Sequence, residues 1–190
     1  MDHETLIAQT RAWVETVIIG LNLCPFAARP ARANRIRYAV SEAGTPAELA
    51  EDLIRELELL ESSSPDEIET ALLIHPNTLQ NFLEYNDFLE VADTILEDLG
   101  LEGEFQIASF HPAYQFEGTE PESAENYTNR SPWPMLHLLR EASVSEAVDL
   151  HPDIESVPEE NVRKMEALGL DAVRALREKA FETGQHPDKG

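Results

Sequence analysis

The segment that most restricts the fold is the apolar run ALLI at residues 71–74. Successive side chains of a strand point to opposite faces of the sheet, so a strand that is apolar at every position must be covered on both faces. The run stops at the polar segment HPNT, which follows it directly. We therefore expect residues 71–74 to form the central strand of a sheet that lies between two layers of helices.

Two further segments have the alternation of a strand. In NRIRYAV, at residues 34–40, Ile36, Tyr38 and Val40 alternate with polar or small residues, which is the period of a half-exposed edge strand. The segment EFQIASF, at residues 104–110, alternates in the same way and predicts a third strand.

Helical patterns of substantial length separate these strands. Thr45, Pro46 and Glu48 have the spacing of a capping box with proline at the first helical position, and Thr78 is placed to cap a second helix that Gly100 closes. Helical connections of this length suit parallel strands. We therefore predict an α/β fold with a small three-stranded, mostly parallel sheet in the order 1-2-3, flanked by helices.

Right-handed crossovers would put both connecting helices on one face of this sheet. The other face then needs cover from additional N- and C-terminal helices. Asp2 is placed to cap an N-terminal helix that ends near Gly20, while Ser156 precedes a helix that Gly169 separates from a last one. These are the elements that we expect on the second face.

The chain has 190 residues, of which 42% are hydrophobic and 27% charged, an ordinary balance for a globular protein. It predicts a single α/β domain over residues 1–183 and a flexible tail at 184–190. No charged leader precedes an apolar run, and polar residues interrupt the apolar stretch at 13–23. With one cysteine the chain has no internal disulfide. We expect a cytoplasmic protein without a membrane span.

The formal net charge is -23, which argues against nucleic acid as a partner because the phosphate backbone would be repelled. Acidic residues are concentrated in residues 42–104, where Arg55 is the one basic residue. Solvated helix faces explain such a block, and a surface that docks a basic protein is the alternative. The four arginines at 29–37 form the one basic stretch.

His75 and His111 each follow a predicted strand directly and precede a proline. Ligands of open parallel sheets bind beyond the carboxyl ends of the strands, so these two side chains are candidates for a shared site. The proline restricts the backbone of each histidine to extended conformations. Ordinary turn formation is the alternative explanation of the His-Pro pairs.

The segment SPWPMLHLLRE, at residues 131–141, predicts a helix that Ser131 caps with Pro132 at its first position. Helical spacing would place His137 and Arg140 on the same side. The N-terminus of such a helix, with Arg130 beside it, would also favour a bound anion.

Cys24 precedes Pro25, which suits the first position of a short helical turn with Cys24 as its cap. A thiol at a helix N-terminus near arginines has a lowered pKa and is a candidate nucleophile. Burial between Leu23 and Phe26 would instead raise the pKa and leave the thiol inert. Both interpretations remain open from the sequence.

Familiar signatures of nucleotide-binding loops, zinc proteases and common serine hydrolases are absent from the sequence. A metal or haem site is chemically allowed, because thiolate and imidazole suit zinc, copper or haem iron. Its ligands would come from four separate elements without diagnostic spacing: Cys24, His75, His111 and His137.

The segments LNLCPFA, FHPAYQF and NYTNRSPWPMLHLLRE together resemble a bacterial family of small uncharacterised proteins catalogued as domain of unknown function 1415. The resemblance extends from the first helix to about Val148. It implies a bacterial, cytoplasmic protein and supplies no activity. The candidates within these segments are Cys24, His111, Asn129, Arg130, His137 and Arg140.

The leading hypothesis is a small-molecule enzyme that acts on an anionic substrate in a pocket beyond the carboxyl ends of the strands. Its catalytic groups would be Cys24, as nucleophile or redox thiol, with His111 or His137 as acid or base. The residues expected to bind substrate are His75, Tyr127, Asn129, Arg130 and Arg140. The alternatives are a metal- or haem-binding protein without turnover and an acidic protein-interaction module.

Overall fold

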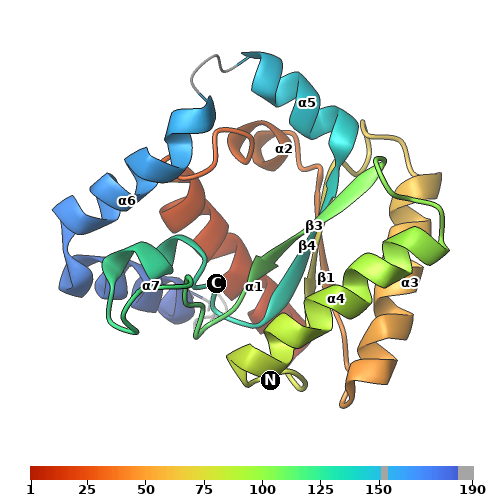
Figure 1. The fold of residues 1–190 in the computed structure, drawn as a ribbon, viewed down its shortest axis with the longest axis horizontal. Helices are drawn as coiled ribbons and strands as arrows, with labels where there is room; N and C mark the ends of the chain where they lie inside the picture. The colour runs from red at the N-terminus through yellow and green to blue at the C-terminus, as the bar shows by residue number, and fades with distance from the viewer. Residues whose placement is uncertain (151–153, 184–190) are drawn as a thin grey trace, which may run out of the picture.

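The computed structural model describes residues 1–150 and 154–183, and its four strands form one mixed sheet in the order β1-β2-β4-β3. The strands are β1 (Ile36–Val40), β2 (Thr70–Ile74), β3 (Phe105–Phe110) and β4 (Met135–Arg140). β1 pairs with β2 in parallel, and β4 pairs antiparallel with both β2 and β3. The first three strands therefore point in one direction, with β4 inserted between β2 and β3 in the opposite direction (Figure 1).

The three predicted strands are present, but the prediction of a three-stranded sheet in the order 1-2-3 is wrong. The additional strand β4 is the segment for which Ser131 and Pro132 predicted a helix. Ser131 and Trp133 each precede a proline, which disfavours the helical conformation at both positions. The segment bends at Pro132 and Trp133 and then enters β4, so there is no helix N-terminus at Ser131 to receive an anion.

The helical elements cover both faces of the sheet. α3 and α4 lie on one face, whereas α1, η1, α6 and α7 lie on the other, as predicted (Figure 1). The bounds are α1 (His3–Trp13), η1 (Val14–Ile19), α2 (Ala28–Arg32), α3 (Pro46–Ser62), α4 (Phe82–Asp98), η2 (Ala124–Thr128), α5 (Glu141–Leu150), η3 (Ile154–Ser156), α6 (Val157–Leu168) and α7 (Leu170–Thr183).

Local capping signals place most of the helix ends correctly. The Thr45 hydroxyl accepts from the backbone N–H of Glu48, whose carboxylate accepts from the backbone of Thr45, so the predicted capping box is formed. Asp2 accepts from Thr5 N–H at the start of α1. Gly169, with φ 78° and ψ 154°, separates α6 from α7 in a positive-φ conformation that glycine adopts without strain.

The start of α4 differs from the prediction that Thr78 is its cap. The backbone at Leu79 has φ 53°, which is incompatible with a right-handed helix through this position. Asn81 is the actual cap, and its side chain accepts from the N–H groups of Leu83 and Glu84. The helix therefore begins after the turn.

The central strand β2 contributes to two separate cores, as the ALLI run predicts. Ala71 and Leu73 face α3 and α4, and Leu72 and Ile74 face α1 and the C-terminal helices. All five β2 residues are buried. In the part of the chain that the structure describes, no helix is long and apolar enough to cross a membrane. The predicted tail at 184–190 lies outside the described residues.

Candidate functional site

A cavity of about 750 Å³ opens on the face of the sheet that carries α1 and α6. Small-molecule sites typically occupy about 300–1,000 Å³ and have mainly apolar walls with a few polar groups. The cavity has this composition. Its apolar lining includes Trp13, Val14, Ile18, Leu23, Phe26, Ile36, Leu72, Phe110, Phe116, Leu139, Val144, Ala147, Leu150, Val157 and Val162.

The cavity lies over one face of the sheet, not beyond the carboxyl ends of the strands as expected, although Phe110 at the end of β3 also lines it. Its walls include Ile36 and Thr70, the first residues of β1 and β2, together with Arg140, the last residue of β4. The expectation of a pocket beyond the carboxyl ends assumed that all strands run in the same direction, so that their carboxyl ends lie together. The antiparallel β4 ends at the other edge and leads directly into α5, which forms part of the cavity wall.

His137 is the histidine of the cavity wall. Its Nε2 lies 2.8 Å from the Thr70 hydroxyl, which also lies 2.6 Å from the carbonyl oxygen of Leu138. Burial in apolar surroundings lowers the pKa of His137 to about 4, so the imidazole is neutral at neutral pH. β4 positions this side chain, since alternation turns His137 toward the cavity while Leu138 faces the opposite core.

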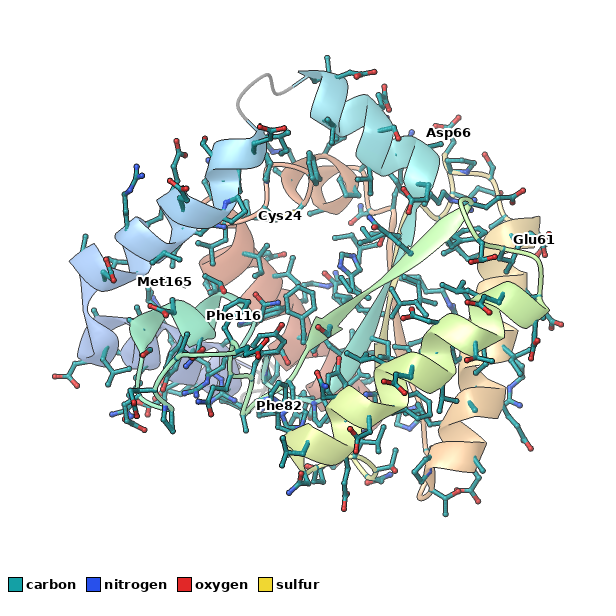
Figure 2. All side chains as sticks on the ribbon, viewed as in Figure 1. Cys24, Glu61, Asp66, Phe82, Phe116 and Met165 are labelled. Carbon is teal, nitrogen blue, oxygen red and sulfur yellow. The ribbon has the colours of Figure 1, made fainter. Side chains whose placement is uncertain are left out.

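Cys24 also lies in the cavity wall, on the segment that leads into α2 beside α6 (Figure 2). Burial raises the pKa of its thiol, and hydrogen bonds from the backbone of Phe26 and Ala27 offset only part of that effect. The predicted helical turn from Pro25 starts later than expected. α2 begins at Ala28 with Ala27 at the capping position, so Cys24 is not a helix cap.

The two arginines of the cavity wall are committed to other partners. Arg140 donates to the backbone carbonyls of Leu60, Ile68 and Ser63, which fixes the guanidinium between β4 and the end of α3. Burial lowers the pKa of Arg140 without neutralising it. Arg29 forms an ion pair with Glu146 at 2.9 Å.

The loop before β4 contains three of the predicted binding residues, of which one reaches the cavity. Asn129 is in the wall, and its amide donates to the Ser109 carbonyl. Arg130 donates to the carbonyls of Tyr114 and Pro121 and lies over the ring of Tyr127, 4.7 Å from its centroid. Arg130 therefore holds the loop together and does not line the cavity.

His75 and His111 follow β2 and β3 as predicted and lie near each other, but in a buried aromatic cluster away from the cavity. Their rings lie 5.8 Å and 5.0 Å from that of Tyr85. His75 Nδ1 bonds the Thr78 carbonyl, and burial lowers the pKa of His75 to about 4. His111 bonds the Leu79 carbonyl and an N–H of its own turn, and burial lowers its pKa as well.

The candidate residues thus divide into two groups. Cys24, Asn129, His137 and Arg140 share the cavity, whereas the lining does not include His75, His111, Tyr127 or Arg130. Within residues 1–150 and 154–183, no three His, Cys, Asp or Glu side chains are grouped as metal ligands. The four proposed ligands therefore do not converge.

Three buried polar residues of the cavity wall were not selected as site candidates from the sequence: Thr70, Trp13 and Glu69. Thr70 fixes His137, and its role depends on the pairing of β2 with β4. Trp13 and Glu69 are buried in the wall, and Nε1 of Trp13 and Oε2 of Glu69 have no hydrogen-bond partner among the described residues. For Thr70 the signal was the second pre-proline residue, Trp133, which disfavours a helix before β4 and so allows the pairing with β2. The sequence carries no comparable signal for Trp13 or Glu69.

The model of a family described as a protein of unknown function, DUF1415, matches residues 5–175. This span includes all strands and every residue that lines the cavity. No curated protein and no solved structure matches the chain.

Proposed function

The chain belongs to the DUF1415 family, and we propose that it binds a small, largely apolar molecule in the cavity between the sheet, α5 and α6. The single observation that carries this proposal is the cavity itself. It has the volume of a ligand site, and its mainly apolar walls surround one neutral histidine.

The proposal keeps the expected small-molecule ligand and changes its chemistry. An anion would favour free cationic side chains, but Arg140 and Arg29 already have carbonyl or carboxylate partners. The wall also contains three carboxylates, those of Glu69, Glu125 and Glu159. Apolar contact therefore supports binding more strongly than charge does.

Catalysis is the second candidate, because Cys24 and His137 line the same cavity. An acid or base and a nucleophile must reach the same substrate, and a shared cavity meets that requirement. Binding without turnover and catalysis both require the cavity to accept a ligand. A binding experiment therefore comes first.

The test is a substitution that fills the cavity from α5. Ala147 lines the cavity, and an Ala147→Trp side chain would occupy part of it. The neutral fluorophore N-phenyl-1-naphthylamine, which brightens in apolar surroundings, should bind the wild-type protein. We expect Ala147→Trp to weaken its binding by about tenfold or more, which corresponds to about 1.4 kcal/mol of lost contact.

The matched control is Ala142→Trp, at an exposed position of the same helix that does not line the cavity. It should bind the fluorophore like the wild type, with an unchanged circular dichroism spectrum. No binding to the wild type, or equal binding by the two tryptophan variants, would refute the proposed site.

A further inference from the structure

We propose that His137 Nδ1 accepts a hydrogen bond from the ligand, so that the cavity selects neutral, largely apolar molecules that carry a hydroxyl group. This inference rests on the proposed function and defines the class of ligand. Its basis is the hydrogen-bond arrangement of His137, Thr70 and Leu138 at the cavity wall.

The Thr70 hydroxyl determines which nitrogen of His137 carries the proton. A hydroxyl has one hydrogen, and that of Thr70 is donated to the carbonyl oxygen of Leu138 at 2.6 Å. At its 2.8 Å contact with His137 Nε2 the hydroxyl oxygen must therefore accept. Nε2 is then the protonated nitrogen of the neutral ring, and Nδ1 has a lone pair.

The lone pair of Nδ1 is open to the cavity. Nδ1 has no hydrogen-bond partner among the described residues. Among the described residues, the fully buried side-chain atoms that lack a partner are Trp13 Nε1, Glu69 Oε2 and His75 Nε2. His137 Nδ1 lacks a partner but is outside this group, so it is not fully buried. His137 also keeps some accessible surface although it lies deep in the fold, and that surface belongs to the cavity wall.

The surroundings of His137 favour a neutral donor. The Phe110 ring lies 5.9 Å from the imidazole ring, and Leu72 and Leu139 line the adjoining wall. A neutral hydroxyl can donate to Nδ1 while its apolar body contacts these side chains. A carboxylate has no proton to donate to Nδ1, and burying its charge here would be costly.

The test compares three ligands that share one ring system: 1-naphthol, 1-methylnaphthalene and 1-naphthoate. Their dissociation constants are measured by displacement of N-phenyl-1-naphthylamine from the wild type and from His137→Phe. We expect His137→Phe to weaken 1-naphthol by about fivefold or more, the worth of one hydrogen bond, and to leave 1-methylnaphthalene within about twofold. The carboxylate should bind the wild type more weakly than 1-naphthol.

A second measurement needs no variant and so does not depend on how His137→Phe folds. Nitrogen NMR of the labelled wild type should show His137 Nδ1 as the unprotonated nitrogen. Its resonance should shift on addition of 1-naphthol toward that of a hydrogen-bonded acceptor, without a comparable shift on addition of 1-methylnaphthalene.

The two proposals fail in different ways. If the fluorophore does not bind the wild type, the proposed function fails. If it binds but none of the three ligands displaces it, only the inference about the hydroxyl is overturned. If 1-methylnaphthalene binds but His137→Phe weakens both neutral ligands equally, or if Nδ1 carries the proton, only the inference about the hydroxyl is overturned. Tighter binding of 1-naphthoate than of 1-naphthol would also overturn it.

Discussion

At the scale of single residues, burial keeps both Cys24 and His137 neutral. It raises the pKa of the thiol and lowers that of the imidazole, so the two do not form a thiolate and imidazolium pair at neutral pH. A catalytic role for Cys24 would therefore require a bound substrate to change these surroundings. Neither group carries a charge in the resting site, which agrees with the proposed binding of neutral molecules.

The pKa of Cys24 leads to a prediction for alkylation. The rate of reaction with iodoacetamide should rise with pH through 9, because only the thiolate reacts and burial raises the pKa above the ordinary value of 9.0. A saturating apolar ligand in the cavity should slow the reaction. The measurement is the alkylation rate by mass spectrometry from pH 6 to 10, and a plateau near neutral pH would contradict the raised pKa.

At the scale of elements, the sequence predicts whatever depends on local patterns. The capping box of Thr45 and Glu48, the alternation in β1 and β3, and the glycine break at Gly169 all involve residues close in the chain. These features confirm the corresponding predictions. The placement of α3 and α4 on one face and of the terminal helices on the other was predicted from the right-handed crossover rule and is also confirmed.

The misassignment of β4 has a physical reason. A short apolar segment buried on both faces lacks the polar alternation that distinguishes a strand from a buried helix. In β4, Met135 contributes to one core and Leu136 and Leu138 to the other, so periodicity gives no signal. The partners that stabilise β4 as a strand lie about 65 and 30 residues away, in β2 and β3, beyond the reach of local patterns.

Tyr85 links α4 to the two strands that sequence reasoning could not pair. Its hydroxyl donates to the Met135 carbonyl at 2.8 Å and accepts from the Phe110 N–H at 3.0 Å. Tyr85→Phe would remove the hydroxyl that bonds the Met135 carbonyl and the Phe110 N–H in this buried site. We expect it to lower the free energy of unfolding by about 1–3 kcal/mol, measured by urea denaturation at pH 7.

The matched control for this prediction is Tyr114→Phe. The Tyr114 hydroxyl makes no hydrogen bond to any residue that the structure describes, so its removal should change the free energy of unfolding by less than about 0.5 kcal/mol. Equal losses in the two variants would show that the bridge by Tyr85 adds no stability.

At the scale of the whole molecule, the buried histidines link the stability of the fold to pH. Burial lowers the pKa of His75 and His137 to about 4, against an ordinary value of 6.5, and lowers that of His111 as well. The unfolded chain therefore binds these protons at a higher pH than the folded chain does. The stability that these neutral histidines contribute is complete above about pH 6.5, and it is lost progressively as the pH falls toward 4.

This linkage gives a prediction for His137→Phe. A depression from 6.5 to about 4 corresponds to roughly 3 kcal/mol for one residue. Urea denaturation at several pH values should show that wild-type stability falls between pH 6.5 and 4.5, and that His137→Phe has a shallower pH dependence. Tyr114→Phe provides the control, because it removes no histidine and should keep the wild-type slope.

The opposite result has a clear form. If His137→Phe and the wild type lose stability with the same slope, the buried imidazole does not contribute to the acid sensitivity. Comparison of slopes also removes the effect of carboxylate protonation, which reduces the self-repulsion of a chain with a net charge of -23 equally in both proteins.

Part of the candidate site could be predicted from the sequence. Cys24, Asn129, His137 and Arg140 were selected as single residues, and all four line the cavity. The cavity itself could not be located, because its position depends on the order of the strands and on α5. The contact between Thr70 and His137 could not be predicted either, because it forms only when β2 pairs with β4.

The position of β4 also has a consequence for how the chain is made. β4 is the last strand in the sequence and yet separates β2 from β3 in the sheet. During synthesis, a nascent chain that ends before residue 135 exposes the hydrogen-bonding edge of the apolar strand β2, and β3 has no sheet to join. Protein synthesis must therefore proceed past residue 140 before the sheet can close, which leaves the first three strands open to wrong pairing until then.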